Sequence, residues 1–569
     1  MKRKSIDTGK HLVAALLLVF PAVLAAQEAD LILNNGQIYT PSGWEKAVAV
    51  RRGVIVALGD DAAMTQFAGD DTQVVDLEGA AVLPGLHDLH AHPTAAGISQ
   101  LQCNFPQGST SEQLLAAVAG CAASHERGEW ITGGQWDASS FGDQPMHRRM
   151  LDEVAPDNPV SLVDISGHSI WVNSRALELA GITQDSFNPP GGVIERTAAG
   201  DITGVLRESA AGLVRGIIPP DSPARAREAL GWATQQMLSY GITSFTDALV
   251  TGVNMQAYAD LADSGLLKQR VRTCMIWSGA SLFGGNDDGM PVYVTQRNLY
   301  ARDRVRPDCI KLVLDGVPTD GHTAAMVEPY ADTQATGSNR DRGILMVEQA
   351  RLETLVTRLD AMGFTVKMHA AGDGAVRAGL NAIAAARRAN GFTGNLHNVA
   401  HNSFVQMDDI RRARSIAATF EMSPYIWFPN PIIPDVVKAV GEERMKRWVP
   451  VKDAIEAGAL VVPGSDWPVV PNVNPWVGIE TLVTRQAPGG IGEPLGEAEK
   501  ITLDEAIAMF TVNAARQFGN SLKTGAIDIG MLADLIVLDR NPFDIPVTDI
   551  HNTKVLKAFI EGGLVYQAQ

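Results

Sequence analysis

The chain has 569 residues, more than one simple domain usually holds, so we expect two or three structural units. Apolar residues make up 46% of the chain, which is enough for a large core. The 47 lysines and arginines are outnumbered by 64 aspartates and glutamates, giving a net charge of -17. This balance argues against a nucleic-acid partner, because nucleic-acid binding relies on a basic surface.

Residues 1–25 have the pattern of a secretory signal peptide. A basic start, Lys2 to Lys4, precedes an apolar stretch from Leu12 to Leu24 that is too short for a membrane span. Val23 and Ala25 offer small residues where a signal peptidase reads the chain, so we predict cleavage after Ala25. The mature protein is then expected to be periplasmic or secreted, without a membrane partner. An uncleaved anchor is the alternative.

Four cysteines fit an oxidising compartment. Cys103 and Cys121 lie in one polar segment and are predicted to form a disulfide. Cys274 and Cys309 lie within apolar, strand-like runs. We expect them to be buried thiols, because an unpaired cysteine packs as a small hydrophobic residue.

The two ends of the chain show the same pattern, in which short predicted strands are separated by Gly-rich turns. A few short strands bury too little apolar surface to be stable alone. We therefore predict that residues 26–82 and 521–569 pair into one small β-sandwich domain. The expected N-terminal strands are Asp30–Leu33, Gln37–Thr40, Ala47–Arg51, Val54–Leu58 and Gln73–Leu77.

The segment from about 97 to 225 is rich in Gly, Pro, Trp and polar residues and is long for a loop. Two stretches inside it have helical patterns, Ser111–Ser124 and Ser174–Leu179. Long insertions at the mouth of a scaffold often act as lids, so Trp136, His168 and Trp171 are candidate substrate-binding residues. The alternative is that these side chains pack inside the insertion.

Strand-like and helix-like runs alternate through residues 83–520, which predicts parallel βαβ units. Eight strand candidates favour a (β/α)₈ barrel over a doubly wound sheet, and no Gly-rich phosphate loop follows the first strand. The candidates are Ala80–Leu83, Gly241–Thr246, Val271–Trp277, Cys309–Leu314, Phe364–His369, Leu396–His401, Ile416–Met422 and Ala459–Pro463.

Polar side chains that can bind a metal follow or end five of these runs. In a barrel the active site lies at the carboxyl ends of the strands, so these residues are expected to meet. Four histidines and one carboxylate suit zinc or a similar divalent ion, with one or two ions per chain. The predicted metal-binding residues are His90, His92, Lys311, His369, His401 and Asp466.

The order and the sequences of these motifs resemble those of the amidohydrolase superfamily, in the family 3 branch that includes N-substituted formamide deformylases. Further matching stretches lie at 167–177, 204–208, 323–326 and 532–539. The resemblance implies hydrolysis of a non-peptide C–N bond in a small-molecule amide, formamide or carbamate. It also implies that Lys311 is carboxylated and bridges two metals. A Lys311–Asp315 ion pair beside a single metal is the alternative.

The implied chemistry uses a metal-activated hydroxide. Asp466 acts as general base and then general acid, and His401 or a second metal polarises the carbonyl. His322 is a further candidate near the substrate. A deaminase of the same superfamily is one alternative, although Gly372 stands three residues after His369, where those enzymes carry a glutamate. A non-catalytic periplasmic binding or regulatory protein is another. The oligomeric state stays open.

Overall fold

The computed structural model describes residues 28–106, 109–136, 141, 145–164, 169–189, 192–277, 290–319, 322–332, 341–430 and 432–569. The predicted signal peptide and His168 therefore lie outside the described residues. Within these ranges, no helix combines the length and apolar content needed to cross a membrane.

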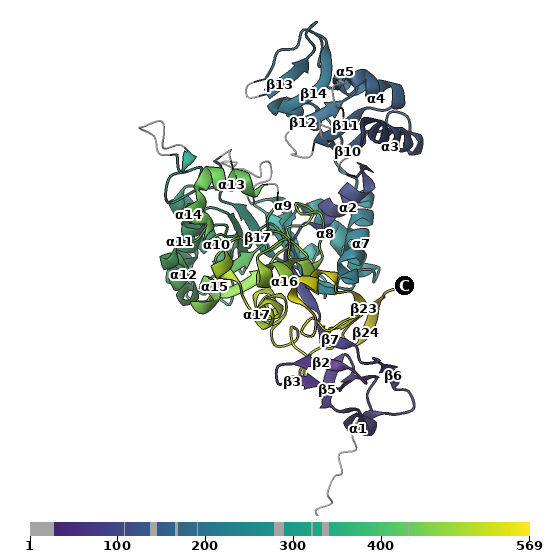
Figure 1. Cartoon of the computed structure of the whole chain (residues 1–569), viewed down its shortest axis with the longest axis vertical. Coiled ribbons are helices and arrows are strands. Elements are labelled where there is room, and N and C mark those ends of the chain that lie inside the picture. The colour runs from purple at the N-terminus through teal and green to yellow at the C-terminus, as the bar shows by residue number, and fades with distance from the viewer. Residues whose placement is uncertain are drawn as a thin grey trace, which may run out of the picture.

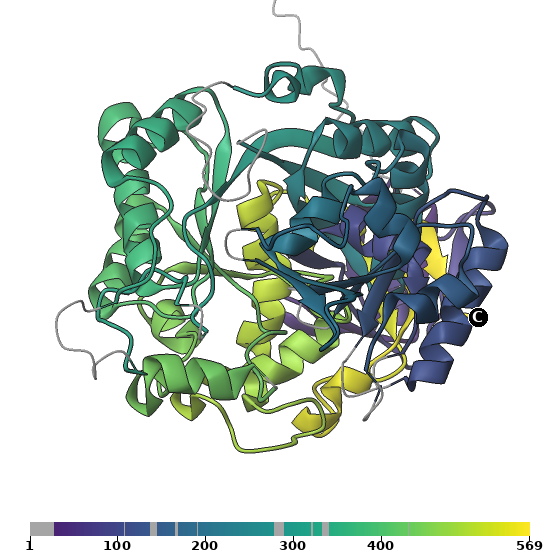
Figure 2. The same ribbon diagram turned by 90° about the horizontal axis from the view of Figure 1, so that it is seen from above.

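The centre of the molecule is an eight-stranded parallel sheet that curls into a barrel with helices around it (Figures 1 and 2). The strand order is β21-β20-β19-β18-β17-β16-β15-β8, as expected for a (β/α)₈ barrel. Seven of the eight predicted strands are present. The barrel strands are β8 (Leu86–Ala91), β15 (Ile242–Val250), β16 (Arg270–Ile276), β17 (Val305–Val313), β18 (Thr365–Ala370), β19 (Asn398–His401), β20 (Thr419–Met422) and β21 (Leu460–Pro463).

The predicted first barrel strand is wrong. Residues Ala81–Pro84 form β7, which pairs with β2 and β22 in the terminal domain. The barrel strand is the next segment, β8, which begins just after Gly85. It carries His87, Asp88 and His90, all buried, so it lacks the apolar run that marks the other strands.

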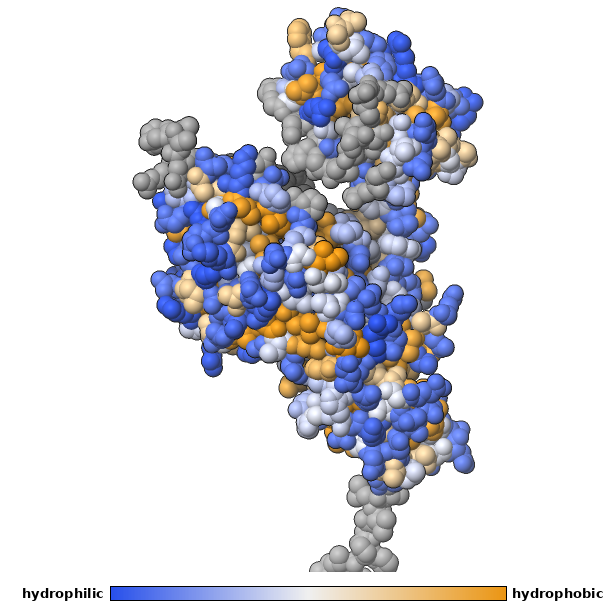
Figure 3. All heavy atoms as spheres, viewed as in Figure 1, coloured by the Kyte–Doolittle hydropathy of each residue, from blue (hydrophilic) through white to orange (hydrophobic). Residues whose placement is uncertain are grey.

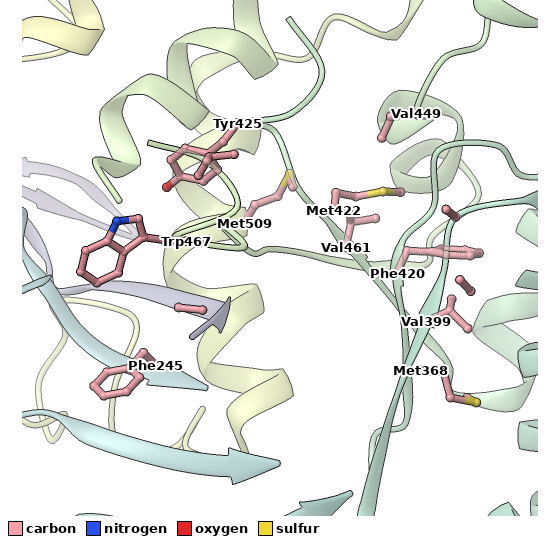
Figure 4. Packing of buried hydrophobic residues seen from close by; sticks show 14 of the residues in the cluster. Phe245, Met368, Val399, Phe420, Met422, Tyr425, Val449, Val461, Trp467 and Met509 are labelled. Atoms are coloured by element: carbon pink, nitrogen blue, oxygen red, sulfur yellow. The ribbon is translucent and has the colours of Figure 1, made fainter. Parts of the chain in front are cut away.

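Apolar side chains on the outer face of the strands pack against the surrounding helices and form the main core. Figure 4 shows Met368, Val399 and Phe420 from neighbouring strands in this cluster. Gly379 of α11 lies directly over Val399, where an added Cβ would approach the valine to 2.8 Å. The main barrel helices are α7 (Pro223–Ser239), α8 (Gly252–Asp263), α10 (Gln349–Ala361), α11 (Asp373–Asn390), α12 (Met407–Ala413), α13 (Ile433–Val440), α15 (Val451–Glu456), α16 (Pro475–Thr484), α17 (Leu503–Ala508) and α18 (Ala514–Phe518).

Both ends of the chain build a two-sheet domain below the barrel in Figure 1, as predicted. One sheet has the order β5-β4-β1-β6 and the other β24-β23-β22-β7-β2-β3. Apolar residues from both sheets share one core. The strands are β1 (Leu31–Asn34), β2 (Gln37–Thr40), β3 (Gly43–Glu45), β4 (Ala47–Arg51), β5 (Val54–Gly59), β6 (Gln73–Asp76), β22 (Leu535–Leu538), β23 (Val555–Ile560) and β24 (Gly563–Gln567).

The insertion after β8 is a separate layer of sheet and helices at the top of Figure 1. Its six strands have the order β13-β14-β12-β11-β10-β9. The two predicted helices are present as α3 (Ser111–Ser124) and α5 (Ser174–Leu179). The other elements are α2 (Pro93–Leu101), β9 (Cys103–Asn104), β10 (Ile131–Trp136), α4 (Arg148–Val154), β11 (Val160–Asp164), β12 (Ser169–Val172), β13 (Gly192–Arg196), β14 (Ile202–Glu208) and α6 (Ser209–Arg215).

The four cysteines form two disulfides. Cys103 of β9 is bonded to Cys121 of α3, which confirms that prediction. The expectation of two buried thiols is wrong, because Cys274 of β16 is bonded to Cys309 of β17. These two residues are direct partners in neighbouring parallel strands, and their Cα atoms are 4.2 Å apart. Both remain fully buried, as expected.

Candidate metal centre

The first and last strands of the barrel are joined by hydrogen bonds at the carboxyl end. The Asp466 amide donates to the carbonyl of His90 over 2.6 Å. The Asp88 carboxylate accepts from the amides of both His90 and Ser465, each at 3.0 Å. This seam places the side chain of Asp466, from the turn after β21, beside the histidines of β8.

Asp466 is the centre of the polar cluster. Its Oδ1 atom lies 3.1 Å from Nε2 of His92 and 3.5 Å from Nε2 of His90. Its Oδ2 atom lies 4.0 Å from Nδ1 of His401. Lys311 of β17 also approaches His90, with Nζ 3.0 Å from the same Nε2 atom. Four separate strands therefore direct donor atoms to one point.

The sixth predicted residue, His369 of β18, completes the cluster. Its ring centroid is 4.4 Å from that of His401. Its Nε2 atom donates to the carbonyl of Gly316 over 3.0 Å, which fixes the ring and leaves Nδ1 as the acceptor nitrogen. The structure thus brings together all six residues that the sequence analysis selected.

The protonation states of the cluster suit metal binding. Burial, together with the charges of Lys311 and Lys367, holds the pKa of His90 well below its usual value. Burial and the neighbouring His369 do the same to the pKa of His401. Burial alone would raise the pKa of Asp466, but the interactions with His401 and His92, which include the 3.1 Å contact with His92, outweigh it and lower that pKa. Neutral imidazoles beside a carboxylate are the forms that a metal needs.

Burial also lowers the pKa of Lys311, to about 8, and the nearby Lys367 charge adds to this effect. The Asp315 carboxylate does not compensate Lys311, because it accepts backbone N–H bonds from Ala325, Ala371 and Gly372 at 2.9–3.0 Å. The ion pair considered as an alternative for Lys311 is therefore not the arrangement found.

The donor set fits a divalent ion. One ligand atom from each of His90, His401 and Asp466 lies within 4.8 Å of the others, and all three residues are buried. Two imidazoles and a carboxylate are typical zinc ligands, and catalytic zinc sites use three protein ligands with one position left open. The residues present thus fit a metal site.

Two of these residues have unusual backbone conformations. His401 has φ +77° and Asp466 has φ +62°, the left-handed region that non-glycine residues seldom occupy. The side chain of Asn402 holds the first turn by donating to the carbonyls of Val399 and Glu421, at 3.0 and 2.8 Å. Such strain persists only where surrounding contacts maintain it, and it concentrates at functional sites.

A buried ion pair behind His90 was missed by the sequence analysis. Glu421 of β20 contacts His90 Nδ1 with one carboxylate oxygen and Lys367 Nζ with the other. Lys367 also donates to the carbonyl of Leu89 over 2.9 Å. Burial raises the pKa of Glu421 to about 7, although the Lys367 charge opposes this shift. By accepting from Nδ1–H, Glu421 leaves His90 Nε2 as the ligand atom, which is the usual arrangement around metal-binding histidines.

In the sequence, Glu421 and Lys367 are recognisable only because each is a charged residue inside an apolar run. Asp247 of β15 is a third case, and its carboxylate accepts from the Tyr258 hydroxyl over 2.9 Å. Burial raises the pKa of Asp247 to about 6, and the charge of the neighbouring His92 opposes the shift.

Comparison with known proteins identifies the family. The sequence profile of the amidohydrolase family matches residues 73–566. The chain belongs to this family. It is 28% identical over 551 residues to the N-substituted formamide deformylase of Arthrobacter pascens, covering 95% of this chain and 99% of the relative. It is 29% identical over 547 residues to the putative amidohydrolase YtcJ of Bacillus subtilis, covering 94% of this chain and 99% of the relative.

The fold is shared as well. An uncharacterized metal-dependent hydrolase from Pyrococcus furiosus superposes with a TM-score of 0.72 at 24% identity, over 90% of this chain and all of that one. These matches confirm the resemblance seen in the sequence. Family membership makes the protein a hydrolase, and the cluster around Asp466 is the candidate metal centre of this amidohydrolase.

Of the residues predicted to line the substrate pocket, the two tryptophans are not at this centre. Trp171 is fully buried in the core of the insertion, edge-on to Phe141. Trp136 is buried in the same core and donates from Nε1 to the carbonyl of Leu162 over 2.8 Å. Both tryptophans therefore pack inside the insertion, which is the alternative left open above.

His322 belongs to a local cluster in the loop after β17. Its ring stacks on Tyr330 with 4.1 Å between centroids. Nδ1 lies 2.8 Å from Asp341 Oδ2, and Nε2 lies 3.1 Å from Asp332. Carboxylates on both sides of the ring tie this histidine to its own loop.

The Glu421 contact gives a first prediction. In Glu421→Gln, His90 loses its carboxylate partner and Lys367 keeps its charge without a counter-ion. We expect metal affinity to fall about 10- to 100-fold, the range seen when such supporting groups are removed. Metal content after dialysis against graded chelator concentrations measures this.

Glu480→Gln is the matched control, because Glu480 is equally buried but accepts hydrogen bonds from Gly489 and His551, neither of which belongs to the cluster. Its metal affinity should equal that of the wild type. A Glu421→Gln protein with wild-type metal affinity would show that Glu421 does not position His90.

Proposed function

We propose that this amidohydrolase is an exported, metal-dependent enzyme that hydrolyses a non-peptide C–N bond in an amide, formamide or carbamate. The single observation that carries the proposal is the convergence of His90, His92, Lys311, His369, His401 and Asp466 at the carboxyl end of the barrel. The formamide deformylase of Arthrobacter pascens, similar over nearly its whole length, supports this bond type.

The cluster divides into two groups of possible ligands. His90, His92 and Asp466 lie together on one side, and His369 and His401 lie on the other. A divalent metal, zinc by its ligand types, would lower the pKa of a bound water and polarise the substrate carbonyl. We assign Lys311 as a carboxylated bridge between the groups, because its buried amine has a lowered pKa and no carboxylate partner among the described contacts.

Asp466 is the proton-transfer group. Its pKa is held low, so it is a carboxylate at neutral pH and can accept a proton from the attacking water. It then returns this proton to the amine nitrogen as the C–N bond breaks. The products are a carboxylic acid and an amine, and one water is consumed. His401, whose Nδ1 lies 4.0 Å from Oδ2 of Asp466, would orient the carbonyl oxygen.

A cavity beside the cluster can hold the substrate. It has a volume of about 460 Å³ and begins at His92 and Asp247. Volumes of this size are typical of sites for small molecules. Its walls mix apolar residues, such as Ile98 and Leu249, with a few polar groups.

Export is supported by the N-terminal pattern of residues 1–25 and by the cysteines. Two disulfides link all four cysteines. Disulfides persist in oxidising compartments such as a periplasm and are rare in the cytosol.

The function is tested by metal removal with formanilide and acetanilide as substrates. We expect amine release by the purified protein, loss of this activity after dialysis against a chelator, and its return with Zn²⁺.

The role of Lys311 is tested separately. In Lys311→Ala, metal content should fall from two ions to about one or none, whereas the exposed Lys438→Ala control keeps the wild-type content. Labelled bicarbonate should give a carbamate signal in carbon-13 NMR of the wild type only.

A purified protein that holds no metal and is unaffected by chelation would refute the metal-dependent hydrolase. Two bound metals with an unmodified Lys311 would refute the carboxylated bridge alone.

The role of Asp466 is tested by Asp466→Asn. The amide has the same size but cannot accept and return a proton, so we expect kcat to fall on the order of 10²- to 10⁴-fold while folding is retained. Steady-state kinetics, circular dichroism and metal analysis measure these effects. A rate close to that of the wild type would mean that another group is the base.

Export is tested by intact mass spectrometry of a periplasmic fraction. We expect a chain that starts at Ala26 and is four hydrogens lighter than the fully reduced form, because both cysteine pairs are linked. A chain that retains residues 1–25, or that carries reduced thiols, would contradict export into an oxidising compartment.

A further inference from the structure

One face of α2 forms a wall of the cavity beside His92. Ala95, Ile98, Ser99 and Gln102 all line it, and residues spaced by three and four lie on the same side of a helix. The opposite side of α2 is fixed to the barrel. An added Cβ at Gly97 would lie 2.0 Å from the carbonyl of Ala229 in α7, so the two helices are in direct backbone contact. The cavity wall is therefore held rigidly.

The charged groups of this proximal cavity have one sign. Besides His92, its titratable lining residues are Asp221 and Asp247, and no lysine or arginine lines it within the described part of the chain. Asp221 is ion-paired with Arg225, whereas no described lysine or arginine is paired with Asp247, whose carboxylate accepts from the Tyr258 hydroxyl. A carboxylate without a cationic partner disfavours an anionic ligand through like-charge repulsion. The part of a substrate next to the reacting bond should therefore be uncharged or cationic.

A second cavity lies between the insertion and the start of α7. It has a volume of about 580 Å³. Strands β10 to β12 of the insertion supply Thr132, Val163 and Ile170, and the neighbouring loops supply Trp130 and Ile218. These residues are uncharged and mostly apolar, whereas Glu129, Arg215, Asp221 and Arg225 supply a charged part of the lining. In Figure 3 the surface is hollowed between the insertion and the barrel.

The two cavities adjoin each other. Gln102, which follows the last residue of α2, and Asp221, which precedes α7, line both of them. Asp221 is held in place by an ion pair with Arg225, with 3.1 Å between Oδ1 and Nε. Gln102 is half-buried, and its side chain forms the uncharged wall of the passage.

We propose that the two cavities form one extended substrate channel that runs from His92, past Gln102, to a distal subsite on the sheet of the insertion. The channel selects elongated N-substituted amides or formamides whose chain is uncharged near the nitrogen and ends in an apolar or aromatic group. Trp130, Ile170 and Ile218 contact that end group. The inference rests on the proposed function, since it assigns the substrate class of the same site.

The experiment compares three substrates: N-methylformamide, which fills only the space at the metal centre, the formamide of a long ω-phenylalkylamine, and N-formylglycine, which is short and anionic. In wild type we expect kcat/KM for the long substrate to exceed that for N-methylformamide by at least about tenfold, or about 1.4 kcal/mol. N-formylglycine should be the poorest substrate.

Two variants test the passage. Gln102→Trp fills the junction and should reduce the long-to-short ratio of kcat/KM about tenfold. Gln100→Trp introduces the same bulk two residues away, at an exposed position that lines neither cavity, and should keep the wild-type ratio. Trp130→Ala, at the far end, should raise KM for the long substrate about tenfold without lowering its kcat.

The outcomes separate the two proposals. If wild type turns over none of these formamides and neither formanilide nor acetanilide, the proposed function fails and the channel fails with it. Turnover of the anilides without turnover of the long formamide refutes the channel alone. If N-methylformamide is hydrolysed but the ratio is unchanged in Gln102→Trp, the channel alone is refuted. Efficient hydrolysis of N-formylglycine would refute the charge preference. Should Gln102→Trp not fold, an unchanged KM for the long substrate in Trp130→Ala refutes the distal subsite.

Discussion

The closure of the barrel between β8 and the turn after β21 is the contact on which the rest of the structure depends. The Asp466 amide donates to the His90 carbonyl, and the His92 amide donates to the Trp467 carbonyl over 2.8 Å. These bonds join the first and last strands, which are otherwise the two edges of the sheet. Because His90, His92 and Asp466 are themselves the joined residues, the metal centre exists only when the barrel is closed.

The contacts behind His90 explain why polar groups are tolerated in the barrel interior. A buried charge without a partner is costly, and removal of one partner destabilises a protein strongly. Here Lys367, Glu421 and His90 form a continuous chain of contacts that compensates each member. The same chain fixes which nitrogen of His90 faces the cluster. Stability of the interior and orientation of a ligand thus depend on one set of interactions.

Much of the barrel and all six cluster residues could be predicted from the sequence, because most of the parallel strands are apolar runs and several of them have a single metal-binding side chain at or near the carboxyl end. The first barrel strand could not, since β8 has three buried polar side chains and lacks such a run. Its neighbour β7 has the apolar pattern because both of its faces are covered: Val82 packs in the core of the terminal domain, and Ala81 and Leu83 pack in the main core.

The other features that the sequence analysis predicted wrongly or did not find have a common cause, because all of them depend on tertiary contacts. The pairing of Cys274 with Cys309 depends on the register of two strands that are 35 residues apart, which sequence spacing alone does not give. Glu421 is a single acidic residue whose partner, Lys367, lies on a different strand. Trp136 and Trp171 follow glycines in the sequence, as pocket residues often do, but both side chains pack in the insertion's own core.

The contact between Gly97 and Ala229 has a consequence for how such an enzyme can diversify. The chain leaves the barrel through α2 and returns through α7, so the insertion is attached at two points that touch each other. A segment of different length or fold could replace it by recombination at these points, because it has only a short gap to bridge. The barrel would keep its metal-binding residues while the insertion was exchanged. A change of substrate would then require no change in the chemistry of the barrel.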